Sequence, residues 1–295
     1  MLFLDFCATV SAPERLLDYL RNMGVLHRTV ICGKCTREMA IQCFSTSCDG
    51  CRFRCSRCKA TKSIRTGSFM AECRLSLQKF SSIVYLLQAE VPFKFIAELL
   101  DIHPNTVTDY ANLIRENYGR DLVENGALLG GQGKIVQVDE SLLAKSKRSR
   151  NNSARPIREQ WVFGAFDPQQ GQGWIQLIDR RDAETLEPII QSCIPPETTI
   201  YSDAWGAYGG LRKLGYDHHV VVHEHHFVDP ETGVHTNNVE AFWQRCKRRF
   251  KRMYGTSRGL LASHVDEFLW LERHGKTFFD RVINTFKLLK RHYTE

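Results

Sequence analysis

The chain has 295 residues, of which 43% are hydrophobic and 25% are charged, and its formal net charge is +7. These values are typical of a globular protein with enough apolar material for a core, and the positive charge is a modest indication of a polyanionic partner. The opening MLFLDFCATV carries an acid within its apolar run, and no uncharged apolar stretch reaches about 18 residues. We therefore expect no signal peptide, no membrane span and no membrane partner.

Residues 1–28 are expected to form an N-terminal helical segment. A short stripe of leucines follows SAPER, and Ser11 is a candidate N-cap for the helix. Gly24 comes directly after the last residue with helical spacing, where a glycine commonly ends a helix.

A cluster of cysteines marks the next segment, residues 29–75. Eight of the eleven cysteines fall here, and two CxxC pairs are separated by 19 residues. Each pair can bind a metal ion from a tight turn, and two such turns complete a tetrahedral thiolate site. The spacing predicts a zinc ribbon in which one Zn²⁺ is held by Cys32, Cys35, Cys55 and Cys58. Redox-active or buried cysteines are the alternative.

Other residues of the same segment leave the ligand assignment open. A third pair, Cys48 and Cys51, offers substitute ligands, while Cys43 and Cys73 offer material for a second site. Basic side chains surround the cysteines, so the ribbon either contacts DNA or presents a solvated cationic surface. These basic residues are Arg37, Arg52, Arg54, Arg57, Lys59, Lys62 and Arg65.

Residues 76–125 are predicted to contain a helix-turn-helix, in the stretch FKFIAELLDIHPNTVTDYANLIREN. Pro104 suits the first turn of the second helix, where its missing N–H is not needed. The apolar spacing predicts a shared buried face, made of Ile96, Leu99, Leu100, Val107, Tyr110, Ala111 and Ile114. The polar residues left for a DNA groove are Asn105, Thr106, Thr108 and Asp109. A purely structural helical hairpin is the alternative.

A glycine-rich stretch at 126–134 is interpreted as a linker, and strand-like and helix-like segments alternate after it. KIVQVDE, QWVFGAF, GWIQLI and TTIYSDA are strand-like, whereas ETLEPIIQSC and NNVEAFWQRCKRRFKRMY have helical spacing. This alternation predicts an α/β domain over 135–275, followed by a basic C-terminal helix over 276–295.

Three acids of this domain have the pattern that metal-dependent phosphoryl transfer needs. Asp139 follows the strand-like KIVQV, Asp203 follows TTIYS, and Glu240 lies near the start of a helix opened by Asn237 or Asn238. Carboxylates at adjacent strand ends and one on a helix can hold two Mg²⁺ (or Mn²⁺) ions about 4 Å apart. Any one of these acids taken alone would be a surface residue, so only the set is informative.

The helix after Glu240 supports this set. Its apolar residues share one face, while Glu240 and Lys247 share a neighbouring stripe. The basic run that follows predicts that phosphates arrive beside the carboxylate, and a solvated basic face or a nuclear localisation signal are alternatives. The residues predicted to contact DNA are Arg245, Lys247, Arg248, Arg249, Lys251 and Arg252.

Residues 30–275 resemble transposases of the Merlin type, which are related to bacterial insertion-sequence transposases with an ISXO-type DDE domain. The resemblance is carried by CGKC, RCSRC, SIRTGSF, GGQGKIVQVDES, QWVFGAFD, RDAETLEPII, TTIYSDAWGAYGGL, HHFVDPETGVHTNNVEAFWQRCKR and MYGT. HTNNVEAFW is the most specific stretch. The 36 residues between Asp203 and Glu240 match the spacing of this type of acid triad.

The resemblance implies a fold and a set of ligands. The fold is ribonuclease-H-like, a mixed sheet flanked by helices, and the implied metal ligands are Asp139, Asp203 and Glu240. Asp139 is preferred to Glu140 because it matches the first acid of the family's VDE motif.

The resemblance also implies supporting residues around those ligands. His235 and Asn237 match residues that shape the active site. Lys247 resembles a DNA-contacting basic residue of related transposases.

The expected activity is that of a DNA transposase, which hydrolyses a phosphodiester at transposon ends and joins the freed 3′-hydroxyl to target DNA. Its expected partners are double-stranded terminal inverted repeats and target DNA, with a homo-oligomer assembled on them. Two alternatives stay open: a host-adopted zinc and helix-turn-helix DNA-binding protein without transposition, and a metal-dependent nuclease. We expect a nuclear location if the source is eukaryotic, a cytoplasmic one otherwise, and no secretion.

Overall fold

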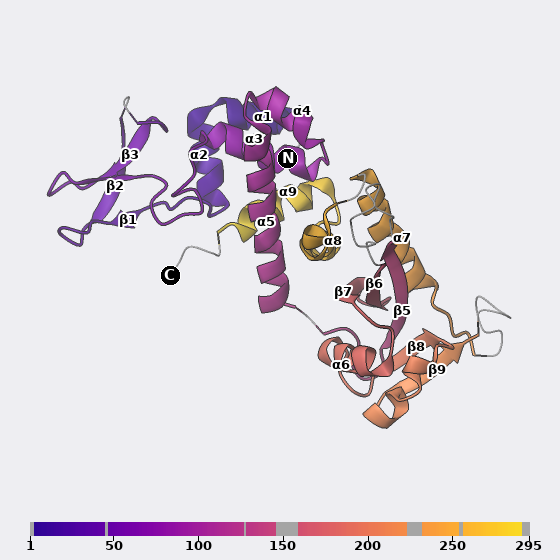
Figure 1. Cartoon of the computed structure of the whole chain (residues 1–295). Helices are drawn as coiled ribbons and strands as arrows, with labels where there is room; N and C mark the ends of the chain where they lie inside the picture. The colour runs from indigo at the N-terminus through magenta and orange to yellow at the C-terminus, as the bar shows by residue number, and fades with distance from the viewer. Residues whose placement is uncertain are drawn as a thin grey trace, which may run out of the picture. The chain divides into compact units, whose positions relative to one another are not determined.

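The computed structural model describes residues 3–44, 47–126, 128–145, 159–222, 232–253 and 256–290 (Figure 1). The chain divides into two compact units. The first comprises Met1–Asp121 together with His274–Glu295, and the second comprises Leu122–Arg273. Each unit has its own sheet, its own helices and its own buried core.

Two helices open the first unit, α1 (Phe3–Ser11) and α2 (Pro13–Asn22). The N-cap of α2 is Ala12, and a proline at the first helical position fixes the backbone for a helix start. The expectation that Ser11 caps this helix is therefore wrong, because Ser11 ends α1. Gly24 follows α2 with φ +78°, a left-handed conformation that glycine adopts without strain, in agreement with the expected helix end.

A small antiparallel sheet forms the cysteine-rich part of this unit, with the strand order β1-β2-β3-β4. Its strands are β1 (Val30–Ile31), β2 (Glu38–Cys43), β3 (Cys51–Arg54) and β4 (Thr61–Ser63). Figure 1 shows β1, β2 and β3 side by side at one edge of the unit. Phe53 on β3 is fully buried, so this small sheet has at least one apolar core residue of its own.

Three helices follow the small sheet: α3 (Leu77–Gln88), α4 (Phe93–Leu100) and α5 (Pro104–Glu124). Only three residues separate α4 from α5, and the first of them, Asp101, takes a left-handed conformation with φ 48°. This is the helical pair that the sequence predicted, with the proline at the first position of α5.

The buried face of the α4–α5 pair is mostly the predicted one. Val107, Ala111 and Ile114 of α5 are buried, and Tyr110 packs against the same cluster. Leu99 of α4 is 68% exposed, which contradicts the prediction. The core side of α4 is set by Ile96, Ala97 and Leu100, and Leu99 lies about 110° around the helix from the centre of that face.

The last helix, α9 (Phe278–Leu288), belongs to the first unit although it is far away in sequence. Thr277 and Asp280 form a reciprocal capping box at its start. In the core, Tyr118 Oη shares a hydrogen bond of 2.7 Å with Thr285 Oγ1 and accepts one of 3.1 Å from Gln88 Nε2. These buried polar contacts tie α3, α5 and α9 together.

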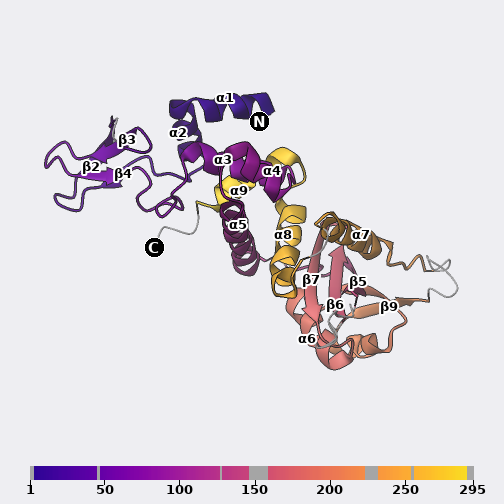
Figure 2. The ribbon, with the colours of Figure 1, turned by 45° about the horizontal axis from the view of Figure 1, so that its top comes forward.

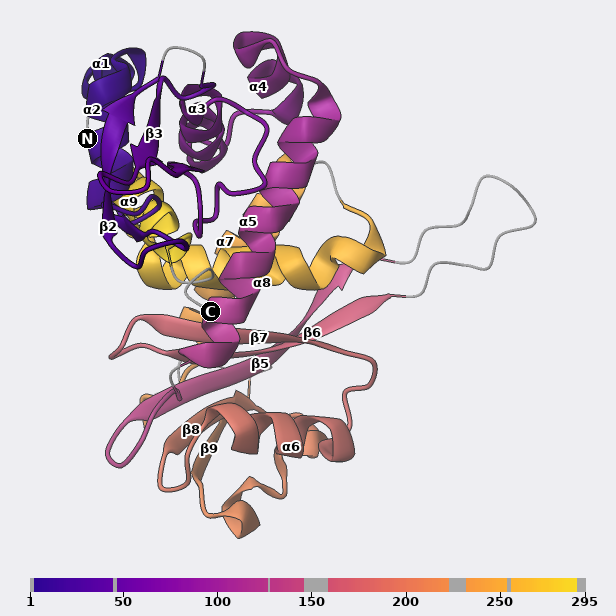
Figure 3. The ribbon, with the colours of Figure 1, turned by 90° about the vertical axis from the view of Figure 1, so that its left-hand side faces the viewer.

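A five-stranded mixed sheet forms the centre of the second unit, with the order β7-β6-β5-β8-β9. The antiparallel strands are β5 (Ile135–Ala144), β6 (Gln160–Asp167) and β7 (Gln172–Ile178), which run side by side in Figure 3. The strands β8 (Thr199–Asp203) and β9 (Asp217–Val221) continue parallel to β5. A mixed sheet flanked by helices was expected, but β9 was not among the strands predicted.

Helices cover both faces of this sheet (Figure 2). On one face α6 (Ala183–Cys193) packs on the even-numbered residues of β5 and the odd-numbered residues of β6. On the other face lies α7 (Asn237–Arg252), followed in sequence by α8 (Leu261–His274). A Cβ atom at Gly164 would overlap the indole of Trp243, so this glycine lets α7 approach the sheet closely.

Part of the expected glycine-rich linker is packed on the second unit. Leu129 is fully buried. The backbone amide of Gly130 donates to Asp167 Oδ2 at 3.0 Å, and that of Gly131 donates to Thr198 Oγ1 at 2.9 Å. The start of β5 is therefore fixed by the residues that precede it. Among the described helices, none combines the length and the apolar character that crossing a membrane requires.

Candidate metal centres

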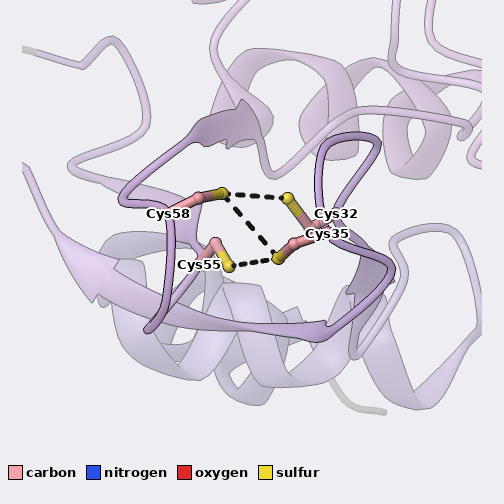
Figure 4. A group of neighbouring side chains, drawn as sticks. All are labelled: Cys32, Cys35, Cys55 and Cys58. Carbon is pink, nitrogen blue, oxygen red and sulfur yellow. Dashed lines mark hydrogen bonds between the residues drawn. The ribbon is translucent and has the colours of Figure 1, made fainter.

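The four cysteines of the two CxxC pairs face one another in the small sheet of the first unit (Figure 4). One pair follows β1 and the other follows β3. The sulfur atoms of Cys32, Cys35, Cys55 and Cys58 all lie within 4.8 Å of one another. Neighbouring sulfurs are 3.3 Å apart for Cys35 and Cys55, and 3.4 Å apart for Cys32 and Cys58. The predicted clustering of these four residues is confirmed.

Matching turns bring the two pairs together. The carbonyl of Cys32 accepts the amide of Thr36, and that of Cys55 accepts the amide of Lys59, at 2.9 Å and 3.1 Å. Thr36 and Lys59 both take a left-handed conformation, with φ 57° and 60°. The backbone amide of Cys58 lowers the pKa of Cys55 to about 6. Because the thiolate is the form that binds metal, this donor set fits a tetrahedral thiophilic cation.

The other cysteines of the segment do not join this cluster. Cys43 and Cys51 are cross-strand partners on β2 and β3. Cys73 Sγ lies 2.7 Å from Tyr110 Oη, and Cys48 Sγ lies 3.5 Å from Arg65 Nη2. The alternative in which Cys48 and Cys51 replace one of the CxxC pairs therefore has no support in the geometry.

Two of the predicted acids occupy matching positions on parallel strands of the second unit. β5 and β8 pair in a register that sets Gln137 opposite Tyr201. Asp139 and Asp203 each come two residues later, so they stand side by side, with Asp203 as the last residue of β8 and Asp139 within β5, which continues to Ala144. The expectation that Asp139 follows its strand is therefore wrong. Side chains alternate between faces along a strand, which turns both carboxylates toward the face that α7 covers.

The environment of Asp139 disfavours its negative charge. The pKa of Asp139 is raised to about 7, chiefly by burial and in addition by the charges of Asp203 and Glu140. A hydrogen bond of 3.1 Å from Trp243 Nε1 to Asp139 Oδ2 acts in the opposite direction. Burial and a second acid nearby both disfavour a negatively charged carboxylate, and a bound divalent cation would offset both effects. This donor set therefore fits a hard cation.

Glu140 faces away from this pair, on the α6 side of the sheet. Its side chain is completely buried, and Oε2 accepts a hydrogen bond of 3.0 Å from Arg181 Nη2. Tyr208 Oη donates to the other oxygen at 2.6 Å. Both oxygens of Glu140 are thus engaged by protein groups, which agrees with the choice of Asp139 as the first acid.

Glu240 lies on the first turn of α7, and Thr236 Oγ1 donates to its Oε1 at 3.2 Å. Trp243, three residues further along, reaches Asp139, so the helix that carries Glu240 contacts the site. In the described part of the chain, however, only the four cysteines form a close ligand group, and the three acids do not.

A glutamine holds the start of α7 against β5. Gln137 Oε1 accepts the backbone amides of Asn238 and Val239 at 2.9 Å and 3.2 Å, and its Nε2 lies 3.2 Å from His235 Nδ1. His235 is therefore fixed near the acids, whereas Asn237 is exposed at the first position of the helix. The role of Gln137 was not predicted, although its spacing of two from Asp139 places both on one face.

The basic residues of α7 divide into two groups. Arg245 pairs with Glu272 at 2.8 Å and lies over the rings of Phe166 and Phe242, and Arg249 pairs with Glu267 at 2.8 Å. These two arginines pack α7 against α8. The remaining members of the predicted DNA-contacting run are Lys247, which is half-buried, and Arg248, Lys251 and Arg252, which are exposed.

At the start of α5, the polar residues assigned to a DNA groove lie outside the buried face. Asn105, Thr108 and Asp109 are exposed, and Thr106 is half-buried. Thr108 Oγ1 donates to the carbonyl of Pro104 at 3.3 Å, which leaves the hydroxyl oxygen as an acceptor.

Three comparisons with known proteins bear on this arrangement. Residues 127–272 match the ISXO2-like transposase domain. An uncharacterised transposase-like protein of Haemophilus influenzae is 26% identical over 94 residues, which cover 32% of this chain and 75% of that protein. The expected resemblance is confirmed by these matches.

Two solved structures show remote likeness. The catalytic core domain of BIV integrase is 14% identical, with a TM-score of 0.34, over 49% of this chain and 85% of that chain. The Mos1 transposase paired-end complex with the left transposon end is 13% identical, with a TM-score of 0.29, over 70% of this chain and 75% of that chain.

Proposed function

We propose that the protein cuts DNA at transposon ends and joins the ends to target DNA, starting from the match of residues 127–272 to the ISXO2-like transposase domain. The observation that carries the proposal is the pairing of Asp139 and Asp203 on neighbouring parallel strands. Burial of Asp139 and its raised pKa support the proposal, because a cation bound there would offset the cost of the buried negative charge.

Asp139, Asp203 and Glu240 would hold two Mg²⁺ or Mn²⁺ ions, which supply charge stabilisation for the attacking and leaving oxygens of the phosphodiester. The role of the protein is to position these ligands. The sheet fixes the two aspartates, Trp243 orients Asp139 through its indole N–H, and Gln137 holds the start of the helix that carries Glu240. Glu240, on the first turn of that helix, would supply the third carboxylate of the set.

Recognition of DNA is assigned to three separate features. One Zn²⁺ held by the four clustered cysteines would stabilise the ribbon. The exposed start of α5, with Asn105, Thr106 and Thr108, would enter a groove as in a helix-turn-helix. Lys247, Arg248, Lys251 and Arg252 on α7 would contact phosphates beside the acids, whereas Arg245 and Arg249 hold the helix in place. The transposase is expected to assemble as a homo-oligomer on DNA.

A nicking assay tests the proposal and separates its alternatives. Labelled terminal-repeat DNA is incubated with the full chain in Mg²⁺ or Mn²⁺, and nicked and joined products are counted. Metal-dependent nicking and strand transfer, both lost in Asp203→Asn, are expected. Binding of the DNA without nicking would indicate a host-adopted DNA-binding protein, and nicking without joining would indicate a nuclease.

A further inference from the structure

Trp205 presents a large aromatic ring to solvent directly beside the acid site. It follows Asp203 by two residues, and its backbone amide donates to Asp203 Oδ1 at 3.1 Å. Its exposed fraction is 45%, and it is the one tryptophan among the exposed large apolar side chains of the described residues. An indole side chain is normally well buried, so this exposed ring next to Asp203 is a candidate contact for a ligand.

One side of this ring is already occupied. The guanidinium of Arg181 lies between two indoles, 4.3 Å from the ring centre of Trp161 and 4.7 Å from that of Trp205. The indole N–H of Trp205 donates to the carbonyl of Arg181 at 2.9 Å. One face of the ring and its polar edge are thus engaged by Arg181, which leaves the opposite face as the candidate surface for a ligand.

The stack of Trp161, Arg181 and Trp205 is anchored in the core. Arg181 pairs with the completely buried carboxylate of Glu140, and Tyr208, which is 1% exposed, donates to the same carboxylate. The ring of Trp205 is therefore held in one orientation before any ligand arrives. A rigid aromatic surface loses little conformational entropy when a planar group stacks on it.

We propose that the exposed face of Trp205 stacks on an unpaired nucleobase of the DNA strand next to the phosphodiester held at Asp139 and Asp203. This inference rests on the proposed function and adds a nucleotide-binding position to it. Every nucleobase has a flat π face, so an aromatic ring binds it without reading the sequence. Bases inside a duplex are already stacked, so the base concerned is one at a strand end or one turned out of the helix.

The position of the ring favours a nucleobase over a partner protein. The backbone of Trp205 contacts Asp203, a proposed metal ligand, while its ring extends to the α6 side with Arg181 and Glu140. A nucleotide next to a phosphate bound at Asp203 would reach the ring around the end of β8. The charge of Arg181 beneath the ring is also compatible with a polyanion, whereas the stack offers a protein partner only a single apolar side chain.

Binding of defined oligonucleotides to the full-length, zinc-loaded chain tests this inference. The probes are a labelled duplex with a three-nucleotide single-stranded extension and the same duplex with abasic sites in the extension. Fluorescence anisotropy in Ca²⁺, a hard cation that can bridge a carboxylate and a phosphate, gives the affinity for each probe. The wild-type chain is expected to prefer the extension with bases by on the order of 10- to 100-fold. Trp205→Ala should reduce that ratio to about one, and Trp205→Phe should keep part of it.

The matched control is Leu260→Ala, which removes another exposed apolar side chain of the same unit and should leave the ratio unchanged. Thermal melting shows whether each variant is folded. An unchanged ratio in folded Trp205→Ala overturns the inference. A change in self-association without a change in the ratio, measured by sedimentation, would also overturn it and identify the ring as a protein contact.

The same experiment separates this inference from the proposed function. A base preference that depends on Trp205, in a chain that never nicks DNA, would leave the stacking position intact and reject the catalytic proposal. If the wild-type chain nicks DNA but Trp205→Ala does not change the ratio of affinities for the two probes, the catalytic proposal stands and the stacking position is rejected.

Discussion

The cysteine cluster of the first unit and the acid pair of the second both gather side chains that bind cations, but they are assembled over very different distances. The cysteines sit on two turns with the same backbone conformation, and their sulfurs lie within 4.8 Å of one another. The acids come from two strands and a helix that follows 34 residues after Asp203, and they do not form a close group in the described part of the chain. The positions of ligands on short turns are set by a few neighbouring residues. The positions of ligands on different strands and a helix are set by the folding of the whole unit.

The electrostatics of the two sites differ in the same way. The backbone amide of Cys58 is the main cause that lowers the pKa of Cys55 to about 6. The amide of Arg37 acts in the same direction on Cys35, but neighbouring sulfurs and burial raise the pKa of Cys35 to about 11. Burial is the main cause that raises the pKa of Asp139 to about 7. The backbone of the cysteine turns therefore favours a charged ligand at Cys55, whereas the core disfavours the charge of Asp139.

The largest effect is expected for Glu240→Gln, which should reduce metal-dependent nicking by several powers of ten. The amide keeps the oxygen that accepts the hydroxyl of Thr236 but lacks the charge that a hard cation needs. The melting temperature and the gel-shift affinity should stay near wild type. Glu184→Gln, a change of an exposed acid in the same unit, is the control. Cleavage near the wild-type rate in Glu240→Gln would remove Glu240 from the triad.

The double variant Cys55→Ser, Cys58→Ser should lose its bound zinc completely, because each CxxC pair supplies half of a tetrahedral site. Elemental analysis of the purified protein measures the zinc content. The matched control is Cys48→Ser, Cys51→Ser, which changes a CxxC pair outside the cluster and should retain about one zinc per chain. Zinc retained in the first variant and lost in the control would reverse the assignment.

Gly164→Ala should destabilise the second unit by roughly 1–3 kcal/mol, because the added methyl group overlaps the indole of Trp243. Chemical denaturation followed by circular dichroism measures the change. Gly259→Ala adds the same methyl group where no atom lies within 4 Å, and it should change stability by less than about 0.5 kcal/mol. Equal effects of the two variants would mean that the close approach of α7 to the sheet is not required.

A smaller, pH-dependent effect follows from the raised pKa of Asp139. The metal-free chain holds a proton that the unfolded chain has lost, so this group makes stability fall as pH rises from the ordinary aspartate range to about 7. Cation binding requires the carboxylate, so the increase in melting temperature caused by Mg²⁺ should be larger at pH 8 than at pH 6. Differential scanning fluorimetry measures both, and Asp139→Asn should abolish the difference. An equal Mg²⁺ effect at both values would show that Asp139 does not bind the ion.

Features encoded by neighbouring residues were predicted well from the sequence. The two CxxC turns, the apolar face of α7 and the position of Asp203 at the end of its strand all follow from local spacing. Asp139 was expected to follow a strand, but it lies within β5, because pairing with β6 continues that strand to Ala144. Two other local predictions were also wrong for physical reasons. Ser11 ends one helix and does not cap the next, because Pro13 starts α2 without a side-chain cap. Leu99 is exposed because α4 is short and its core side is set by three other residues.

Contacts between distant segments were not predicted. The histidine-rich β9 lacks a clear apolar alternation, and its place beside β8 depends on the rest of the sheet. Trp243 was assigned to the core, and nothing in the spacing of α7 indicates that its N–H reaches Asp139, which is 104 residues away. The burial of Glu140 with Arg181 and Tyr208 likewise depends on three separate elements.

The carboxamide of Gln137 gives the start of α7 an unusual dependence on the sheet. The amides of Asn238 and Val239 are among those that a helix cannot satisfy by itself, and here a strand residue supplies the acceptor. Unravelling of the first helical turn would leave a buried carboxamide oxygen without a donor, so the turn and the strand open together as one cooperative element. Local fraying, which is common at helix ends, is thereby suppressed at the turn that carries Glu240.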